Sequence, residues 1–153
     1  MTEKEVVIII RKIKESDREE YIKMAEEFYS SDAVSHTIPK ENFENAFEDA
    51  LNGNVFIELY ILEYEGVTAG YAAIALTYTT EGGGKTAWLD ELYIKEQFRG
   101  KGLGRSVIKL LQKDVSIKRV RLEIMPDNER ATALYKSEGF QECKYRQMIL
   151  DKK

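Results

Sequence analysis

The sequence predicts a single mixed α/β (α+β) domain over residues 1–153, built on a twisted sheet of about six to seven strands flanked by four helices. First, 153 residues with a hydrophobic fraction of 43% suit one domain with its own core. Second, apolar residues recur at helical spacing in some stretches and alternate in others. Third, the stretches follow the order strand, two helices, three-strand meander, helix, strand, helix and strand, which is typical of a mixed sheet.

The first third of the chain contains one strand and two helices. Residues 6–11 are strand-like, and Ser16 with Glu19 has the spacing of a capping box that opens a helix. The apolar positions of this helix recur at helical spacing up to Phe28. Pro39 suits the first turn of a second helix, which the run 52–54, Asn-Gly-Asn, ends.

The rest of the chain alternates between strands and helices. Residues 55–63 and 69–79 form a hairpin, and a glycine-rich turn at 81–85 leads into a central strand at 88–94. A helix, a strand at 120–124 and a short helix capped near Asn128 follow, and Gly139 is well placed to end that short helix. Residues 142–150 alternate and predict a last strand.

Composition excludes several classes of protein. A net charge of −4 without a broad basic surface argues against nucleic-acid binding. No apolar run is long enough to span a bilayer, and the start lacks the layout of a signal peptide, so we expect a cytoplasmic protein without a membrane partner. The lone Cys143 allows no internal disulfide and no metal cluster, so no metal is expected.

Three glycines at alternate positions connect the central strand to the next helix. Gly100, Gly102 and Gly104 let the backbone approach an anion at the helix N-terminus, where N–H groups are free. Lysines and arginines between residues 95 and 105 add positive charge, which predicts a pyrophosphate site. No P-loop string occurs, and a dinucleotide fingerprint would need a glycine at Arg105. The acidic first two helices, at the other end, would suit a cationic amine.

Two motifs carry a resemblance to a known family. Arg99-x-x-Gly102-x-Gly104 resembles the [QR]-x-x-G-x-[GA] signature of the GNAT superfamily of N-acetyltransferases, and the string from Asn128 to Phe140 is similar to that superfamily's N-x-x-A-x-x-L-Y-x-x-x-G-F motif. Residues 89–94 also look like the spermidine/spermine acetyltransferase branch.

The resemblance implies a GNAT-like domain that uses acetyl-CoA. It assigns cofactor binding to the central strand, the glycine loop and the second motif, namely to Leu92, Tyr93, Ile94, Arg99, Gly100, Lys101, Gly102, Leu103, Gly104, Arg105 and Asn128. The Leu92 N–H would polarise the thioester carbonyl. An aspartate at Gly102 or Gly104 is therefore expected to abolish CoA binding and leave the fold intact.

The resemblance also implies catalytic roles. Tyr135 would protonate the leaving thiolate, although its helical position equally suits a core aromatic. Strict alternation along the strand would turn Asp90 into the cleft with Trp88 and Leu92, so Asp90 would accept the amine proton. We expect water to relay this step, because the reference pKa of aspartate is low. The alternative for Asp90 is a structural carboxylate. The histone-acetylating branch has its base at the position of Trp88, a departure that weakens a protein-lysine substrate.

Acceptor binding is expected in the connection at 28–37, which contains Tyr29, Asp32 and His36, and at Glu91 on the strand. A surface loop without this role remains the alternative. The sequence thus predicts an N-acetyltransferase that moves an acetyl group from acetyl-CoA to a primary amine of a polyamine-like or amino-acid-like small molecule, by direct attack in a ternary complex. A non-catalytic acyl-CoA-binding regulatory module and acetylation of a peptide or protein amine are the alternatives, and a homodimer is allowed.

Overall fold

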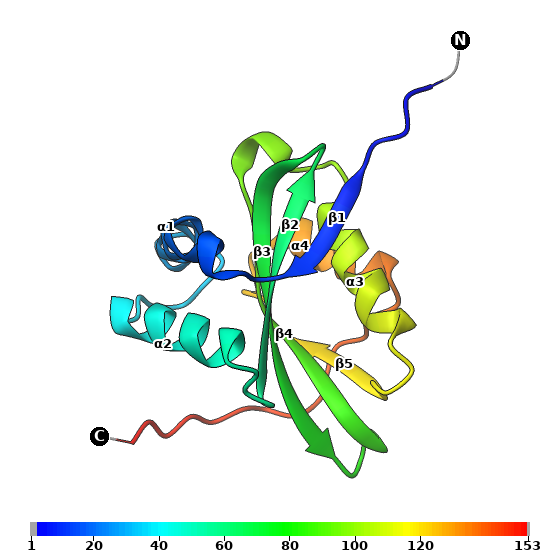
Figure 1. Ribbon diagram of the computed structural model, residues 1–153. Coiled ribbons are helices and arrows are strands. Elements are labelled where there is room, and N and C mark those ends of the chain that lie inside the picture. The colour runs from blue at the N-terminus through cyan, green and yellow to red at the C-terminus, as the bar shows by residue number, and fades with distance from the viewer. Residues whose placement is uncertain (1–2, 153) are drawn as a thin grey trace.

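The computed structural model describes residues 3–152 and contains one five-stranded sheet with helices on both faces (Figure 1). The strand order is β1-β2-β3-β4-β5, with antiparallel neighbours except for the parallel pair β4 and β5. The elements in chain order are β1 (Ile8–Lys12), η1 (Glu15–Asp17), α1 (Arg18–Tyr29), α2 (Lys40–Leu51), β2 (Ile57–Tyr64), β3 (Val67–Thr79), β4 (Gly84–Ile94), η2 (Glu96–Phe98), α3 (Leu103–Lys113), β5 (Arg119–Leu122) and α4 (Glu129–Ser137). The predicted mixed α/β class is confirmed.

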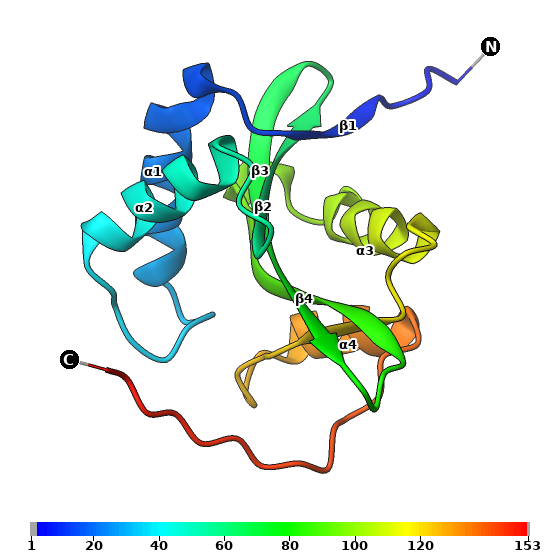
Figure 2. The same cartoon turned by 60° about the horizontal axis from the view of Figure 1, so that its bottom comes forward.

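Each face of the sheet has its own hydrophobic core. Helices α1 and α2 cover one face, and α3 and α4 cover the other (Figures 1 and 2). Under α1 and α2 the core is largely aromatic, with Tyr21 and Phe47 packed at 5.5 Å between ring centroids. Under α3 and α4 it is aliphatic, with Val107, Ile108 and Leu111 of α3 buried. The amphipathic spacing read from the sequence thus selects the buried face of α3.

The strand count is lower than predicted. Residues 142–150 alternate as expected, yet they are extended, exposed and outside the sheet, as Figure 2 shows. Met148 is 97% exposed and Leu150 is 91% exposed. The prediction was wrong because alternation indicates only which side chains share a face. A strand also needs a neighbouring edge for its backbone hydrogen bonds.

Capping differs between the two predicted helix starts. The Asp17 carboxylate, and not Ser16, closes the turn before α1: it accepts a hydrogen bond from the Lys14 N–H at 2.7 Å and two from the Arg11 guanidinium at 2.8 and 3.0 Å. The charge of Arg11, on β1, makes Asp17 the stronger partner. At α4 the prediction is confirmed, because the Asn128 side chain accepts from the Ala131 N–H at 3.2 Å.

A bulge in β4 divides that strand into two halves. Ala73 of β3 lies opposite Glu91 and Ile74 lies opposite Leu89, so Asp90 has no partner residue. The pairing of β4 with β5 runs from Thr86 to Leu89 and ends there. A bulge bends a strand and increases its twist. Beyond Leu89, β4 therefore has a free edge on the side that β5 covers earlier.

The aromatic core gives a first prediction. Phe47 is fully buried, so Phe47→Ala should lower the free energy of unfolding by about 3–5 kcal/mol through lost burial and a cavity. Phe56→Ala, at a phenylalanine 69% exposed, is the matched control and should change it by less than about 0.5 kcal/mol. Chemical denaturation of both variants measures the difference. Equal effects would contradict the assignment of the core.

Candidate active site

The free edge of β4 presents backbone groups to an open pocket. The Lys95 N–H donates to the Ala69 carbonyl on β3 at 2.8 Å. In an antiparallel pair the backbone N–H groups of alternate residues point to the same side, so those of Tyr93 and Glu91 also point toward β3. The N–H groups of Leu92 and Ile94 consequently point away from β3, toward the free edge. The Ile94 carbonyl accepts a hydrogen bond from Arg99 Nε at 2.9 Å, which ties the following loop to the strand.

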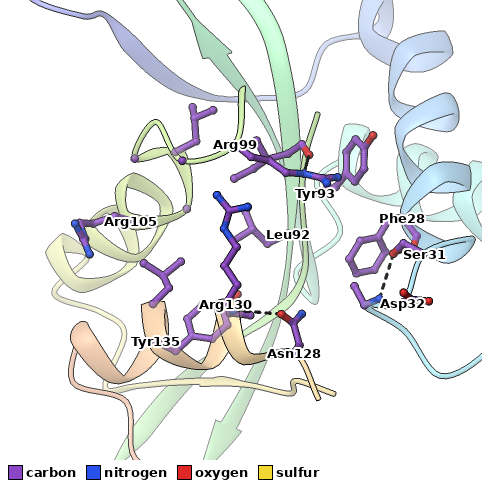
Figure 3. Close-up of a pocket in the computed structure, with 18 residues that line it drawn as sticks. Phe28, Ser31, Asp32, Leu92, Tyr93, Arg99, Arg105, Asn128, Arg130 and Tyr135 are labelled. Atoms are coloured by element: carbon purple, nitrogen blue, oxygen red, sulfur yellow. Dashed lines mark hydrogen bonds between the residues drawn. The ribbon is translucent and has the colours of Figure 1, made fainter. Parts of the chain in front are cut away.

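A pocket of about 610 Å³ surrounds this edge and is lined by residues from both faces of the sheet. Figure 3 shows Phe28, Ser31 and Asp32 on one side of β4, and the side chains of α3 and α4 on the other. The lining comes from the α1–α2 connection, the end of β4, the glycine loop and α4: Phe28, Ser31, Asp32, Ala33, Leu92, Tyr93, Ile94, Arg99, Gly100, Gly102, Leu103, Gly104, Arg105, Asn128, Arg130, Ala131, Leu134 and Tyr135.

The glycine loop ends at the N-terminus of α3 as an anion cradle. Gly102 is the N-cap residue with φ +88°, and Gly100 has φ +75°, both in the left-handed region that favours glycine. A Cβ on Gly102 would meet open space, so the backbone here is accessible to a ligand. The unpaired N–H groups of the first turn of α3 lie beside Arg99, which suits a phosphate, whereas the Arg105 guanidinium pairs with Glu138 and Ser137.

Gly104 has a different role from Gly102. A Cβ at Gly104 would lie 3.1 Å from Leu134 Cδ2 and 3.4 Å from Leu92 Cδ2. Glycine at this position therefore lets α3 pack closely on β4 and α4. We therefore expect Gly104→Asp to strain the fold as well as to block CoA, because a buried aspartate would press on these leucines, whereas Gly102→Asp has open space around it.

Arg130 is a pocket residue that sequence reasoning missed. Its guanidinium lies over the glycine loop, with Nη2 3.3 Å from where a Cβ on Gly100 would stand, and its side chain lines the pocket (Figure 3). The only sequence signal is a basic residue in the first turn of α4, at an unspecified position of the second motif. Arg130 reaches the glycine loop only because α4 packs across that loop in the folded protein.

Tyr135 and Asn128 both project from α4 into the pocket lining. Tyr135 is 9% exposed, and its ring packs edge-on against Phe140 with centroids 5.6 Å apart. Burial raises the pKa of the Tyr135 phenol, so the phenol stays protonated at neutral pH and can donate. Asn128 also caps the helix, as described above.

The alternation argument for Asp90 is wrong, because it ignores the bulge. Leu89 and Leu92 both lie in the core under α3 and α4, so the facing of side chains changes between these two residues. Asp90 itself is exposed in the bulge and does not line the pocket. Its pKa is nevertheless raised by partial burial and by the Glu123 carboxylate. Trp88 is not part of the pocket lining either: the Arg121 guanidinium carbon lies over its indole ring, 4.4 Å from the ring centroid.

Glu91 is the more perturbed of the two neighbouring carboxylates. It is half-buried, and its Oε1 accepts a hydrogen bond from the Tyr71 hydroxyl at 2.7 Å. Burial raises the pKa of Glu91 to about 7, the Tyr71 hydroxyl opposes that rise, and the Asp90 charge adds to it. Glu91, like Asp90, is not itself part of the pocket lining, but the next two residues of the strand, Leu92 and Tyr93, are.

The expected acceptor segment lies only partly at the pocket. Asp32 lines it, whereas Tyr29 packs against the rings of Phe28 and Phe43. His36 is exposed outside the pocket lining, and its Nδ1 lies 2.9 Å from Ser35 Oγ. Lys101, expected in the cradle, instead stands over the Tyr64 ring at 5.5 Å from its centroid.

Two negative findings apply to residues 3–152. No group of three or more His, Cys, Asp or Glu side chains in this range is arranged to hold a metal ion. None of the helices described is long and apolar enough to cross a membrane.

A free strand edge beside an anion cradle, in a pocket lined from both faces of the sheet, suits an extended ligand that carries phosphates. The sequence matches the Acetyltransferase (GNAT) family over residues 15–140. The chain belongs to this family.

The chain is also similar to named relatives, and solved structures share its fold. The chain is 36% identical over 86 residues to spermine/spermidine N(1)-acetyltransferase of Bacillus subtilis (strain 168), a match that covers 52% of this chain and only 57% of the relative. It is 26% identical over 144 residues to thialysine N-epsilon-acetyltransferase of Mus musculus, which covers 87% and 84% of the two chains. Aminoglycoside N-acetyltransferase AAC(6')-Iy in complex with CoA has the same fold, with a TM-score of 0.75 at 16% identity over 100% of this chain and 99% of that one. A predicted acetyltransferase from Clostridium acetobutylicum with acetyl-CoA also gives 0.75, at 18% identity over 94% and 96%.

The raised pKa of Glu91 predicts a pH-dependent stability. Because the folded state favours the protonated carboxyl, its stabilising effect is full below the ordinary pKa of 4.5 and is lost as the pH rises to about 7. Glutamine at this position stays neutral. Over this pH interval the free energy of unfolding of Glu91→Gln should therefore rise relative to that of the parent by on the order of 3 kcal/mol. Denaturation from pH 4 to pH 9 measures it. The exposed Glu44→Gln is the control, and parallel curves for parent and Glu91→Gln would refute the shift.

Proposed function

We propose that this protein transfers an acetyl group from acetyl-CoA to a primary amine of a small molecule, by direct attack in a ternary complex. The observation that carries the proposal is the free edge of β4 at Leu92 and Ile94, which adjoins the cradle in one pocket lined from both faces of the sheet. An extended thioester can then lie along the edge while an amine arrives from the face of α1 and α2.

The cofactor half of the pocket is suited to CoA. The backbone N–H groups at the start of α3, together with the arginines at 99, 105 and 130, would hold its phosphates. The Leu92 and Ile94 edge would pair with the amides of the pantetheine arm. Acetyl-CoA supplies an activated acyl group, and the remaining requirements fall on side chains of this chain.

The chemistry needs two proton movements. The amine must lose a proton to a carboxylate before its nitrogen attacks the carbonyl carbon, because alkylammonium groups titrate near 10. The Leu92 N–H would stabilise the oxyanion as the C–N bond forms. The C–S bond then breaks, Tyr135 would give its phenolic proton to the thiolate, and through water it would take up the second proton that the nitrogen loses as the amide forms. Asp90 and Glu91, beside the bulge, are the two candidate proton acceptors, with Asp90 acting through water.

The acceptor half supports a cationic, polar small molecule. Asp32 and Ser31 line the pocket on that side, beside the ring of Tyr93. The names of two relatives concern polyamines and thialysine, which are small amines. The matched portion covers little more than half of the Bacillus relative, so the acceptor class remains part of the proposal.

An acceptor panel tests the function. Thiol release from acetyl-CoA is followed with spermidine, lysine, an aminoglycoside and a basic peptide, and mass spectrometry identifies the acetylated product. We expect turnover with spermidine or lysine. CoA binding without turnover on any amine would favour a non-catalytic binding module, and turnover on the peptide alone would favour a protein substrate.

Reversing the charge of Arg130 should weaken CoA binding. Arg130→Glu places a negative charge over the glycine loop, so we expect the Kd for CoA to rise by about 10-fold or more, since 1.4 kcal/mol corresponds to tenfold. Lys109→Glu, exposed on α3 outside the pocket lining, is the matched control with the same change in net charge. Isothermal titration calorimetry measures both. An equal Kd for the two variants would remove Arg130 from the cradle.

The proposed acid role of Tyr135 can be separated from its packing. Tyr135→Phe keeps the ring against Phe140 and removes the hydroxyl, so kcat should fall by about 10²-fold while the KM for acetyl-CoA changes little. A pre-steady-state measurement ensures that chemistry limits the rate. An unchanged rate of the chemical step would leave Tyr135 with a packing role alone.

A further inference from the structure

A group of tyrosines surrounds Glu91 on the face of the sheet under α1 and α2. Tyr71 of β3 is fully buried, and its hydroxyl donates to the Glu91 carboxylate at 2.7 Å. Tyr21 and Tyr29 of α1 are the other titratable groups that face Glu91. The Tyr29 hydroxyl lowers the pKa of Glu91 less than the Tyr71 hydroxyl does. Asp90 is the charged neighbour on β4.

Tyr71 has no role in the chemistry described so far. A phenylalanine would fill the same core volume, since the ring makes edge-on contacts with Tyr21 at 5.1 Å and Phe28 at 6.4 Å, and a tilted one with Tyr93 at 6.1 Å. The hydroxyl alone distinguishes the two residues, and its hydrogen bond goes to a carboxylate next to the free edge.

We propose that Tyr71 is a positioning residue that holds the Glu91 carboxylate where it receives the proton of the acceptor amine, so that Glu91 rather than Asp90 is the proton acceptor. This inference rests on the proposed acetyltransferase function. The ammonium N–H bond breaks, its proton goes to a Glu91 oxygen, and the freed lone pair forms the C–N bond. Glu91 later returns the proton to water.

The balance around Glu91 explains why the hydroxyl matters. Burial and the charge of Asp90 favour the protonated carboxyl, which cannot accept a proton, whereas the hydrogen bond from Tyr71 favours the ionised form. With the hydroxyl present, the pKa of Glu91 is about 7, so the carboxylate is available at neutral pH. A base that titrates near the working pH is the efficient choice.

The test compares Tyr71→Phe with Tyr21→Phe, a change of the same kind in the same buried cluster. Loss of the hydrogen bond should raise the pKa of Glu91, so the acid limb of kcat/KM should move to higher pH by about one to two units. We expect a loss of about 10-fold or more at pH 6.5, a smaller loss at pH 9, and little change in the KM for acetyl-CoA. Tyr21→Phe should leave the limb in place. An unmoved acid limb in Tyr71→Phe would overturn the positioning role.

Two further variants identify the base. Glu91→Gln should remove the acid limb and lower kcat/KM by about 10²-fold or more, whereas Asp90→Asn should keep the limb. The opposite pattern would assign the proton to Asp90 and overturn the inference.

A titration that needs no turnover keeps the inference separate from the proposed function. Carbon-detected NMR of the Glu91 carboxyl gives its pKa in the parent and in Tyr71→Phe. If no amine is acetylated, the proposed function fails and the inference about catalysis fails with it. A rise in the Glu91 pKa in Tyr71→Phe would still establish that the Tyr71 hydroxyl stabilises the ionised Glu91 carboxylate. If amines are acetylated and the Glu91 pKa does not rise in Tyr71→Phe, the inference alone fails.

Discussion

The free edge of β4 is the constraint on which the site depends. A buried strand normally satisfies its backbone groups on both sides, and here β5 does so only between Thr86 and Leu89. The unopposed Asp90 bends and twists the strand at that point. Because the remaining N–H groups face a pocket and not another strand, an extended ligand with amide groups can complete the sheet.

Charge is divided between the two sides of this edge. The cradle combines the N-terminus of α3 with arginines from two elements, so its positive potential comes from backbone and side chains together. The opposite side is acidic, yet part of that acidity is used within the fold. Glu20 pairs with Lys95, and Glu27 accepts a hydrogen bond from the Tyr93 hydroxyl. These contacts tie α1 to the end of β4.

Burial of ionisable groups beside the edge links stability to the proposed chemistry. Glu91 lies in an aromatic core that favours its neutral form, and only hydroxyl groups offset this preference. The same surroundings that lower the stability of the fold when this carboxylate ionises would make it a stronger base than an exposed glutamate. Tyr135, on the other face, is buried in a way that keeps it protonated. The two faces thus favour opposite directions of proton transfer.

The sequence by itself determined the features that depend on local spacing. The glycines at 100, 102 and 104, the cap at Asn128 and the motif around Tyr135 lie within single loops or helices, so their patterns could be read directly, and they predicted the family and the mixed α/β class. The tertiary structure decided the rest. Which side of β4 each carboxylate faces depends on a bulge relative to β3, the place of Arg130 depends on α4 crossing the loop, and the hold on Glu91 comes from Tyr71, 20 residues earlier in the chain. Residues 142–150 alternate like a strand and remain outside the sheet. In each case the outcome depends on a partner distant in sequence, and a periodic pattern along one segment contains no information about that partner.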